Sequence, residues 1–319
     1  MAGVSRATVS RYLNEGYVSN EKRERIKQVI EETGYNPSSQ AQTLRTKKTK
    51  LIGVILPKLH SDSVSRMVDG IGLVLSKHGY QLLLANTQND EREELKYLTT
   101  FKYNQVDGII LIGTIFTDEH KKLLSELKVP IVILGQHLEG YPCVYHDDFH
   151  ATKDLAAMLL ENASRIAYIG VTQKDEAAGH NRQEGFLAAY ASKADRVEKP
   201  IMLESNFTIE CAYEKAKELF AMEDRIDTVC CATDNIAVGV LKYVTEIGKK
   251  VPEDVQIAGI GDSQLGRVVW PKLSTVHYHY KTSGIEAAYL LLELLECNSQ
   301  RPKQIRMGYQ VIANDSTRK

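Results

Sequence analysis

The first eleven residues have the types and spacing needed to read DNA bases. The run A-G-V-S-R-A-T-V-S-R, from Ala2 to Arg11, places a glycine and a serine before a short stretch with a polar face. A tight turn followed by a capped helix is how a recognition helix is presented to the DNA major groove. Arginine pairs bidentately with guanine, and alanine contacts the thymine methyl group. The run predicts a DNA-reading helix; the alternative is a small helix whose polar residues only face solvent.

Two histidines raise the question of metal chemistry. His277 and His279 alternate in the segment H-Y-H-Y, a spacing that puts both on one face of a strand. No third ligand has a matching position, so we predict a crossover strand between lobes and no metal site. The cysteines show neither a C-x-x-C pair nor a matching histidine spacing, which favours buried reduced thiols; they are Cys143, Cys211, Cys230, Cys231 and Cys297.

Enzyme signatures are missing from the sequence. It contains no G-x-G-x-x-G or G-x-x-x-x-G-K-[ST] loop, no G-x-S-x-G elbow and no H-E-x-x-H. We therefore expect no enzymatic activity and no cofactor.

From Leu51 onward, short apolar runs alternate with amphipathic stretches, the pattern of parallel sheets covered by helices on both faces. The expected strands are 51–57, 81–87, 106–113 and 130–136, then 165–170, 199–204, 227–233 and 255–261. The expected helices are 63–78, 91–104 and 117–127, then 181–193, 209–222 and 235–249. Two such series in tandem predict an α/β fold of two doubly wound parallel-sheet lobes. Ligands bind outside the carboxyl ends of such strands, so a cleft between the lobes is expected.

The first fifty residues have helix signals but no strand. Ser5 is the expected N-cap of a helix that ends near Asn14, and a second helix runs from Ser19 to Gly34. This region has 10 Lys+Arg against 5 Asp+Glu, a balance of +5, while the whole chain carries −1. A local cluster of cations is typical of a nucleic-acid-binding end. We predict a small all-helical segment (1–36) and a linker (37–50).

Composition places the chain among ordinary globular proteins. Hydrophobic residues make up 43% and charged residues 25% of the sequence. No apolar run reaches the roughly 20 residues that span a bilayer, and the N-terminus lacks the pattern of a secretory signal. We expect no membrane association and a cytoplasmic location.

Several motifs in order resemble those of the lactose repressor/galactose repressor family of transcription regulators. Besides Ala2 to Arg11, they are Y-N-P (35–37), I-G-V-I-L-P (52–57), R-Q-E-G-F (182–186), C-A-T-D-N-I-A-V-G (231–239), I-G-D (260–262) and P-K-L-S-T-V (271–276). The resemblance covers essentially the whole chain. It implies a periplasmic-binding-protein-like pair of lobes for a small sugar-like effector, behind a helix-turn-helix that binds an operator. A sugar receptor without DNA-binding activity is the alternative.

The resemblance also implies roles for DNA-reading residues. Arg6, Ala7 and Arg11 match positions that meet base edges, whereas Ser5, Thr8 and Ser10 are better suited to phosphate contact or capping. In the linker, Leu44 matches an apolar wedge in the minor groove; its alternative is packing on the sensor. Ala41 lies on the same face as Leu44, while Ser38 and Gln42 depart from the family's usual Asn and Arg. The full DNA-binding set is Ser5, Arg6, Ala7, Thr8, Ser10, Arg11, Tyr35, Ala41 and Leu44.

For the effector, the resemblance assigns Arg182 and Asp262 to the gripping of hydroxyl groups and Phe207 to stacking on the ligand. Thr233 replaces a common asparagine, and Asp234 is expected to cap the helix that follows it. Four polar residues in first-lobe loops after strands complete the candidate site, unless they are only solvated; they are His60, Asp62, Gln136 and Asp148.

The resemblance further implies a homodimer that binds a palindromic operator. Lobe 1 is expected at about 51–162 and 278–305, and lobe 2 at about 163–276 and 306–319, with crossings near Asn162, His277 and Arg306. The short stretch after Ile312 favours a dimer over a tetramer. Family members carry a helix before the A-G-V-S turn, so we expect a form with an upstream extension to bind DNA far better than a chain that starts at Met1.

Overall fold

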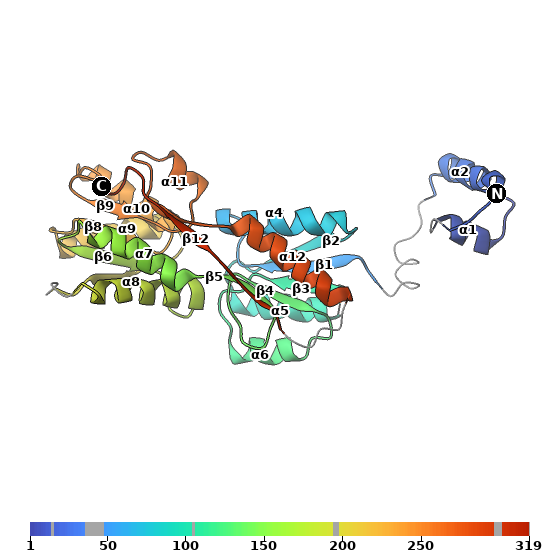
Figure 1. Cartoon of the computed structure of the whole chain (residues 1–319), viewed down its shortest axis with the longest axis horizontal. Coiled ribbons are helices and arrows are strands. Elements are labelled where there is room, and N and C mark those ends of the chain that lie inside the picture. Colours follow the sequence, from blue (N-terminus) through green and yellow to red (C-terminus); the bar gives the residue numbers. More distant parts are fainter. Residues whose placement is uncertain (14–15, 36–47, 104–105, 194–197, 297–301, 319) are drawn as a thin grey trace. The chain divides into compact units, whose positions relative to one another are not determined.

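The computed structural model describes residues 1–13, 16–35, 48–103, 106–193, 198–296 and 302–318 (Figure 1). The chain divides into two compact units, Met1–Lys50 and Leu51–Lys319. The predicted linker falls mostly outside the described residues, so its bounds stay a prediction.

The N-terminal unit contains helices α1 (Arg6–Leu13) and α2 (Asn20–Thr33). The backbone N–H of Thr8 donates to Ser5 Oγ at 3.3 Å, so Ser5 caps α1 as the sequence predicts. Gly34 ends α2 with φ at 63°, a left-handed conformation that glycine adopts without strain. Val18 and Ile26 are the buried apolar side chains of this unit's described part.

A six-stranded parallel sheet forms the first lobe of the second unit. Its order is β11 (Gln304–Met307), β5 (Cys143–His146), β4 (Ile131–Leu134), β3 (Gly108–Leu111), β1 (Leu51–Leu56) and β2 (Gln81–Asn86). Helices α4 (Asp62–Lys77) and α12 (Tyr280–Glu296) pack together on one face, and α5 (Glu91–Tyr103) and α6 (Asp118–Ser125) cover the other (Figure 1). Adjacent strand residues separate accordingly: Val54 joins the α4 and α12 core, whereas Ile55 joins Leu98 and Phe101.

Two glycines allow α4 and α12 to approach closely. A Cβ atom at Gly70 would collide with the backbone carbonyl of Lys281, and one at Gly284 with that of Met67. The helix pair therefore depends on the absence of a side chain at both positions.

The second lobe has a four-stranded parallel sheet in the order β7 (Ile201–Glu204), β6 (Ile166–Gly170), β8 (Thr228–Cys231) and β9 (Gln256–Ala258). Helices α7 (Asp148–Leu160) and α8 (Arg182–Ala191) pack against each other, as do α9 (Ile209–Met222) and α10 (Asp234–Glu246). A π-helical turn, η1 (Glu176–Asn181), precedes α8, and α11 (Gln264–Val268) follows β9. The predicted architecture of two doubly wound lobes is confirmed.

Strands β10 (Thr275–Tyr278) and β12 (Tyr309–Ile312) form a separate antiparallel pair. The sequence pattern did not predict β5, α7 or α12. Because α7 packs against α8 of the second lobe, the chain changes lobes near Asp148, and the predicted crossing near Asn162 is too late. The remaining lobe boundaries stay predictions.

Candidate ligand-binding site and DNA-reading segment

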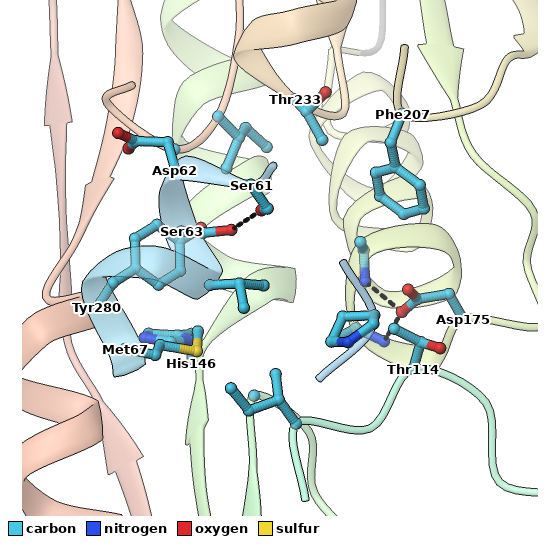
Figure 2. Close-up of a pocket in the computed structure, with 18 of the residues that line it drawn as sticks. Ser61, Asp62, Ser63, Met67, Thr114, His146, Asp175, Phe207, Thr233 and Tyr280 are labelled. Carbon is cyan, nitrogen blue, oxygen red and sulfur yellow. Dashed lines mark hydrogen bonds between the residues drawn. The ribbon is translucent and has the colours of Figure 1, made fainter. Parts of the chain in front are cut away.

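A pocket lies between the two lobes, at the carboxyl ends of both sheets, where ligands are expected in doubly wound folds. Figure 2 shows Asp175 and Phe207 on one side of it and Asp62, His146 and Tyr280 on the other. Much of its lining comes from segments that follow strands: Lys58 after β1, Thr114 after β3, Gln136 after β4, Asp175 after β6, Phe207 after β7 and Thr233 after β8. Tertiary packing thus gathers the ends of strands from both lobes around one cavity.

A buried ion pair within the second lobe, between the first residues of α7 and α8, lines the pocket. Arg182, the first residue of α8, donates from Nε to Asp148 Oδ1 at 2.7 Å and from Nη1 to the carbonyl of Ala232 at 2.6 Å. The hydroxyl of Tyr278 donates to the same Asp148 oxygen at 3.1 Å. Arg182 is 7% exposed and Asp148 4%. Both are predicted effector residues, and the structure brings them into direct contact.

Burial and charge oppose each other in this pair. Burial acts to lower the pKa of Arg182, but the Asp148 carboxylate outweighs it, and the pKa lies well above the ordinary guanidinium value. Burial raises the pKa of Asp148, while the Arg182 guanidinium acts in the opposite direction. Within the described residues, Arg182 Nη2 makes no hydrogen bond, so this group keeps donors for a ligand.

Gln136 of the first lobe and Asp175 of the second form a contact between the lobes. Gln136 Nε2 donates to Asp175 Oδ1 at 3.1 Å and to the carbonyl of Thr114. The same carboxylate accepts the backbone N–H groups of Ala177 and Ala178, because Asp175 is the N-cap of η1. Burial raises the pKa of Asp175 to about 6, although these N–H groups lower it. The predicted residue Gln136 therefore touches a carboxylate that sequence reasoning missed.

Lys58 occupies one face of Phe207. Its Nζ atom lies 4.2 Å from the centre of the ring, a cation–π contact between the lobes. Burial lowers the pKa of Lys58, and the negative charge of Asp175 works against that shift. A ligand ring stacked on this face of Phe207 must displace the ammonium group.

Arg66 joins the lobes at another wall of the pocket. Its Nη2 atom donates to the carbonyl of Gly261 at 2.6 Å and lies 2.7 Å from Asp62 Oδ2. The guanidinium stands 5.0 Å from the centre of the Tyr280 ring. Asp62, expected in a loop, is the first residue of α4, and its carboxylate is engaged by Arg66 one helical turn later.

Thr233, and not Asp234 as the sequence suggests, caps helix α10. Thr233 is the N-cap of α10 and accepts the N–H of Ile236 at 3.3 Å, so Asp234 is not the cap. The Asp234 carboxylate instead accepts the Ser263 N–H and the Thr275 hydroxyl, both at 2.6 Å. Thr233 lines the pocket and retains its hydroxyl proton as a donor.

Two predicted effector residues lie outside the pocket lining. His60 is exposed. Asp262 is buried beside the lining residues Gly261 and Ser263, but its carboxylate is held by Arg267 at 2.8 and 2.5 Å and by His277 Nδ1 at 2.7 Å. Burial alone would raise the pKa of Asp262, but these hydrogen bonds outweigh it and lower the pKa. Effector contact by Asp262 stays a prediction that requires Arg267 to move.

Sequence reasoning missed Lys58, Arg66, His146 and Asp175 as lining residues. Lys58 could have been found, because it directly follows the predicted strand 51–57, whereas His146 ends β5, which the sequence pattern did not predict. Arg66 and Asp175 could not, since only the packing of one lobe against the other brings them to the cavity.

In the N-terminal unit, α1 exposes a polar stripe. Arg6, Ala7, Ser10 and Arg11 are exposed, and the pairs 6/10 and 7/11 are one helical turn apart. Thr8 is half-buried, with its hydroxyl 3.0 Å from Ser5 Oγ, and Tyr35 is exposed. The predicted residues Ala41 and Leu44 lie outside the described residues. The base-reading and phosphate roles of the whole set stay predictions.

Other sequence expectations concern metals, thiols and membranes. Across the described ranges, no group of three or more His, Cys, Asp or Glu side chains could hold a metal ion. Cys143, Cys230 and Cys231 are buried free thiols, whereas Cys211 is only half-buried and Cys297 lies outside the described residues. A search of the described helices found none with the length and apolar character to cross a membrane.

Comparison with known families identifies the class of this protein. Residues 156–317 match a periplasmic binding protein-like domain, and residues 1–38 match the description "bacterial regulatory proteins, lacI family". Together with the fold and the pocket between its lobes, these matches define a regulatory protein with a ligand-binding body. The chain belongs to the lacI family.

Relatives extend the similarity over nearly the whole chain. The sucrose operon repressor of Staphylococcus xylosus is 33% identical over 297 residues, covering 93% of this chain and 92% of the relative. The ribose operon repressor of Bacillus subtilis is 33% identical over 319 residues, with 100% and 96% covered. A solved transcriptional regulator CelR–cellobiose complex is 26% identical, with a TM-score of 0.78 and coverage of 99% of this chain and 97% of that one.

Proposed function

We propose that this chain is a sequence-specific DNA-binding repressor of carbohydrate-utilisation genes, whose operator affinity is set by a sugar-like effector between its lobes. The observation that carries the proposal is the buried Arg182–Asp148 pair, which lies in a pocket between the lobes of a lacI-family chain. The first-lobe residues Gln136 and Arg66 line the same pocket, so a ligand that contacts them together with this pair acts on both lobes at once.

The charges of the lining favour an uncharged effector. Its three cations each have a carboxylate nearby: Arg182 with Asp148, Arg66 with Asp62, and Lys58 with Asp175. No cation among the described lining residues is left without an acidic neighbour, so a phosphate has no dedicated site. Ser61, Ser63 and Thr233 add hydroxyl groups, and Phe207 adds an aromatic face. Hydroxyl-rich rings fit such a lining, and the names of the sucrose and ribose operon repressors agree with this ligand class.

We assign DNA reading to the exposed stripe of α1. Arg6 and Arg11 are placed to pair with guanine and Ala7 to contact a thymine methyl, while Ser5, Thr8 and Ser10 serve the phosphates and the helix cap. The linker residues Ala41 and Leu44 complete the proposed interface, in the minor groove.

We also propose a homodimer. Val268 is 77% exposed and Trp270 84% exposed, next to the exposed Leu265 of α11. The edge strand β2 exposes Leu83 and Leu84. Apolar surface and an open sheet edge of this kind are normally covered by a partner. In light scattering, Trp270→Glu should lower the mass toward that of one chain, whereas the exposed control Met222→Glu should leave it unchanged; equal masses for both variants would exclude this surface.

The mechanism follows from the contacts between lobes. A ligand that binds better to one lobe arrangement shifts the population toward it by its difference in affinity. In the proposed dimer this shift changes the spacing of the two DNA-reading segments.

The test is an operator-binding titration with a sugar panel. A fluorescent palindromic duplex, selected by this chain from a random-sequence library, is titrated by anisotropy with and without ribose, glucose, fructose, sucrose and cellobiose. We expect at least one sugar to change operator affinity, and Arg182→Ala to abolish that response while operator affinity without sugar is retained. If the chain selected no sequence from the library, the proposed DNA binding would be overturned. If no sugar changed operator affinity, the proposed control by a sugar-like effector would be overturned.

A further inference from the structure

A second cavity adjoins the effector pocket. It has a volume of about 420 Å³, and five residues line both cavities: Gly135, Gln136, His146, Asp148 and Ala177. The remaining walls come from the ends of β4 and β5, from the start of α7 with Asp147, Phe149 and His150, from η1 and from Arg306 on β11. The two cavities are therefore neighbours across a single layer of residues.

The boundary between the cavities is thin. Gly135 has no side chain and Ala177 has only a methyl group, so neither fills the space between them. Gln136 has a longer side chain than these two residues. Its hydrogen bonds to Thr114 and Asp175, which line the first cavity, hold it on that side of the boundary. The least side-chain volume between the two cavities therefore lies at Gly135 and Ala177.

His146 is a buried polar group that borders both cavities and lacks a partner. It is 6% exposed, and its Nε2 atom makes no hydrogen bond to any described residue. Its ring packs against Tyr278 and Tyr280, with centroids 4.8 and 4.9 Å away. Burial, reinforced by the charge of Arg182, lowers its pKa to about 3, so the imidazole is neutral. A neutral imidazole donates to or accepts from a hydroxyl group, and an unpartnered buried nitrogen costs stability until it does so.

The second cavity has the chemistry of a sugar site. Tyr145 and Phe149 supply aromatic rings, and His137 lies 5.2 Å from Tyr145, centroid to centroid. Arg306 is 59% exposed, and only its Nη1 atom lies near a carboxylate, 3.5 Å from Asp147 Oδ2, so the other N–H groups of the guanidinium can donate to a ligand. Asn181 adds an amide. Planar polar groups beside aromatic faces bind the hydroxyl edge and the C–H face of a sugar ring.

We propose that the second cavity is a subsite for a second sugar ring, so that the effector is a disaccharide whose two rings lie on either side of the Gly135–Ala177 boundary. This rests on the proposed function and specifies its ligand. One ring contacts Arg182 and Asp148, and the other contacts His137 and Arg306. His146 donates to or accepts from a hydroxyl group near the linkage.

The test compares sugars and variants by isothermal titration calorimetry on the full chain. Sucrose, cellobiose, maltose and trehalose are measured beside glucose, fructose and ribose. We expect one disaccharide to bind at least tenfold more tightly than its component monosaccharides. The double variant His137→Ala/Arg306→Ala should remove that advantage and leave monosaccharide affinity within twofold. Lys303→Ala removes an exposed cation that pairs with Glu293 and lines neither cavity, so it should bind like the unaltered chain.

The outcomes separate this inference from the function on which it rests. A monosaccharide as the tightest ligand, or a double variant with unchanged disaccharide affinity, would overturn the second subsite. If Arg182→Ala still abolished binding in that case, the proposed sugar-sensing function would stand. Binding of no sugar by the unaltered chain would overturn both. The double variant changes two exposed side chains, and an unaltered thermal midpoint checks that it folds.

Discussion

The candidate functional side chains are exposed in the first unit of this chain and buried in the second. Helix α1 has no buried residue, and its DNA-reading candidates Arg6, Ala7 and Arg11 are exposed. In the second unit, Arg182 and Asp148 are almost fully buried and depend on each other. An exposed side chain can be changed without loss of the fold, whereas a buried charge contributes to the fold and the site together. The comparison predicts that function and stability separate in the first unit and remain coupled in the second.

Removal of Asp148 should have the largest effect. Asp148→Ala leaves the Arg182 guanidinium buried without its carboxylate, which costs about 3–5 kcal/mol of the free energy of unfolding. Sugar binding should be lost as well. Urea denaturation and calorimetry measure the two effects, with Asp69→Ala, an exposed carboxylate on α4, as control. A loss below 1 kcal/mol would break the proposed coupling of site and fold.

Substitution in α1 should change function alone. Arg6→Ala removes one proposed pair of hydrogen bonds to guanine, worth about 1–3 kcal/mol of operator affinity. The thermal midpoint should not move, because the side chain is exposed. Anisotropy at fixed salt compares this variant with Arg25→Ala, which removes an exposed arginine that pairs with Glu21 on α2. Equal losses for both variants would mean that charge alone, and not base reading, explains binding.

The pH dependence of stability tests a second buried pair, which lies away from the site. His120 Nε2 lies 3.4 Å from Glu94 Oε1, and both side chains are buried. Burial, reinforced by Glu91, raises the pKa of Glu94 from 4.5 to about 8, and burial lowers the pKa of His120. A raised carboxyl pKa stabilises the fold at low pH, and this contribution is lost as pH rises from 4.5 through 8.

Between pH 6.5 and 8 the unfolded chain still loses part of a proton from His120, whose ordinary pKa is 6.5, and this change is common to the unaltered chain and Glu94→Gln. The difference between the two proteins therefore reports on Glu94. Over this window we expect the unaltered chain to lose up to about 2 kcal/mol more than Glu94→Gln does. Urea midpoints at each pH measure the difference. If the stability of both proteins changed with pH in the same way, Glu94 would not be protonated in the folded chain over this range.

The smallest effect should be a gain in stability. Tyr168 is 1% exposed and stacks on Phe186, but its hydroxyl makes no hydrogen bond to any described residue. Tyr168→Phe removes this unsatisfied group and should raise the free energy of unfolding by about 1 kcal/mol. Tyr309→Phe is the matched control, because its hydroxyl donates to Asp154 at 2.5 Å and its loss should destabilise. A loss of stability in Tyr168→Phe would refute the argument.

Local sequence signals were sufficient for much of the fold. The spacing of apolar residues predicted eight of the strands and six of the helices of the second unit, and Ser5 and Gly34 marked helix ends in the first. The strongly apolar α12 could have been predicted by the same spacing. Strand β5 and helix α7 were harder to predict, because the polar run His146 to His150 joins them.

The site likewise has residues that the sequence identified and contacts that it could not show. Arg182, Thr233 and Phe207 were identified from motifs and line the pocket, but motifs could not show that Asp262 is held by Arg267 and His277. Helix and strand patterns depend on neighbours a few residues apart, and so the sequence by itself determined them. The contacts of Arg182 with Asp148, Gln136 with Asp175 and Arg66 with Gly261 join residues 34, 39 and 195 positions apart. The first contact depends on the packing of α7 against α8 within the second lobe, and the other two depend on the packing of one lobe against the other. Only the tertiary structure therefore decided all three contacts.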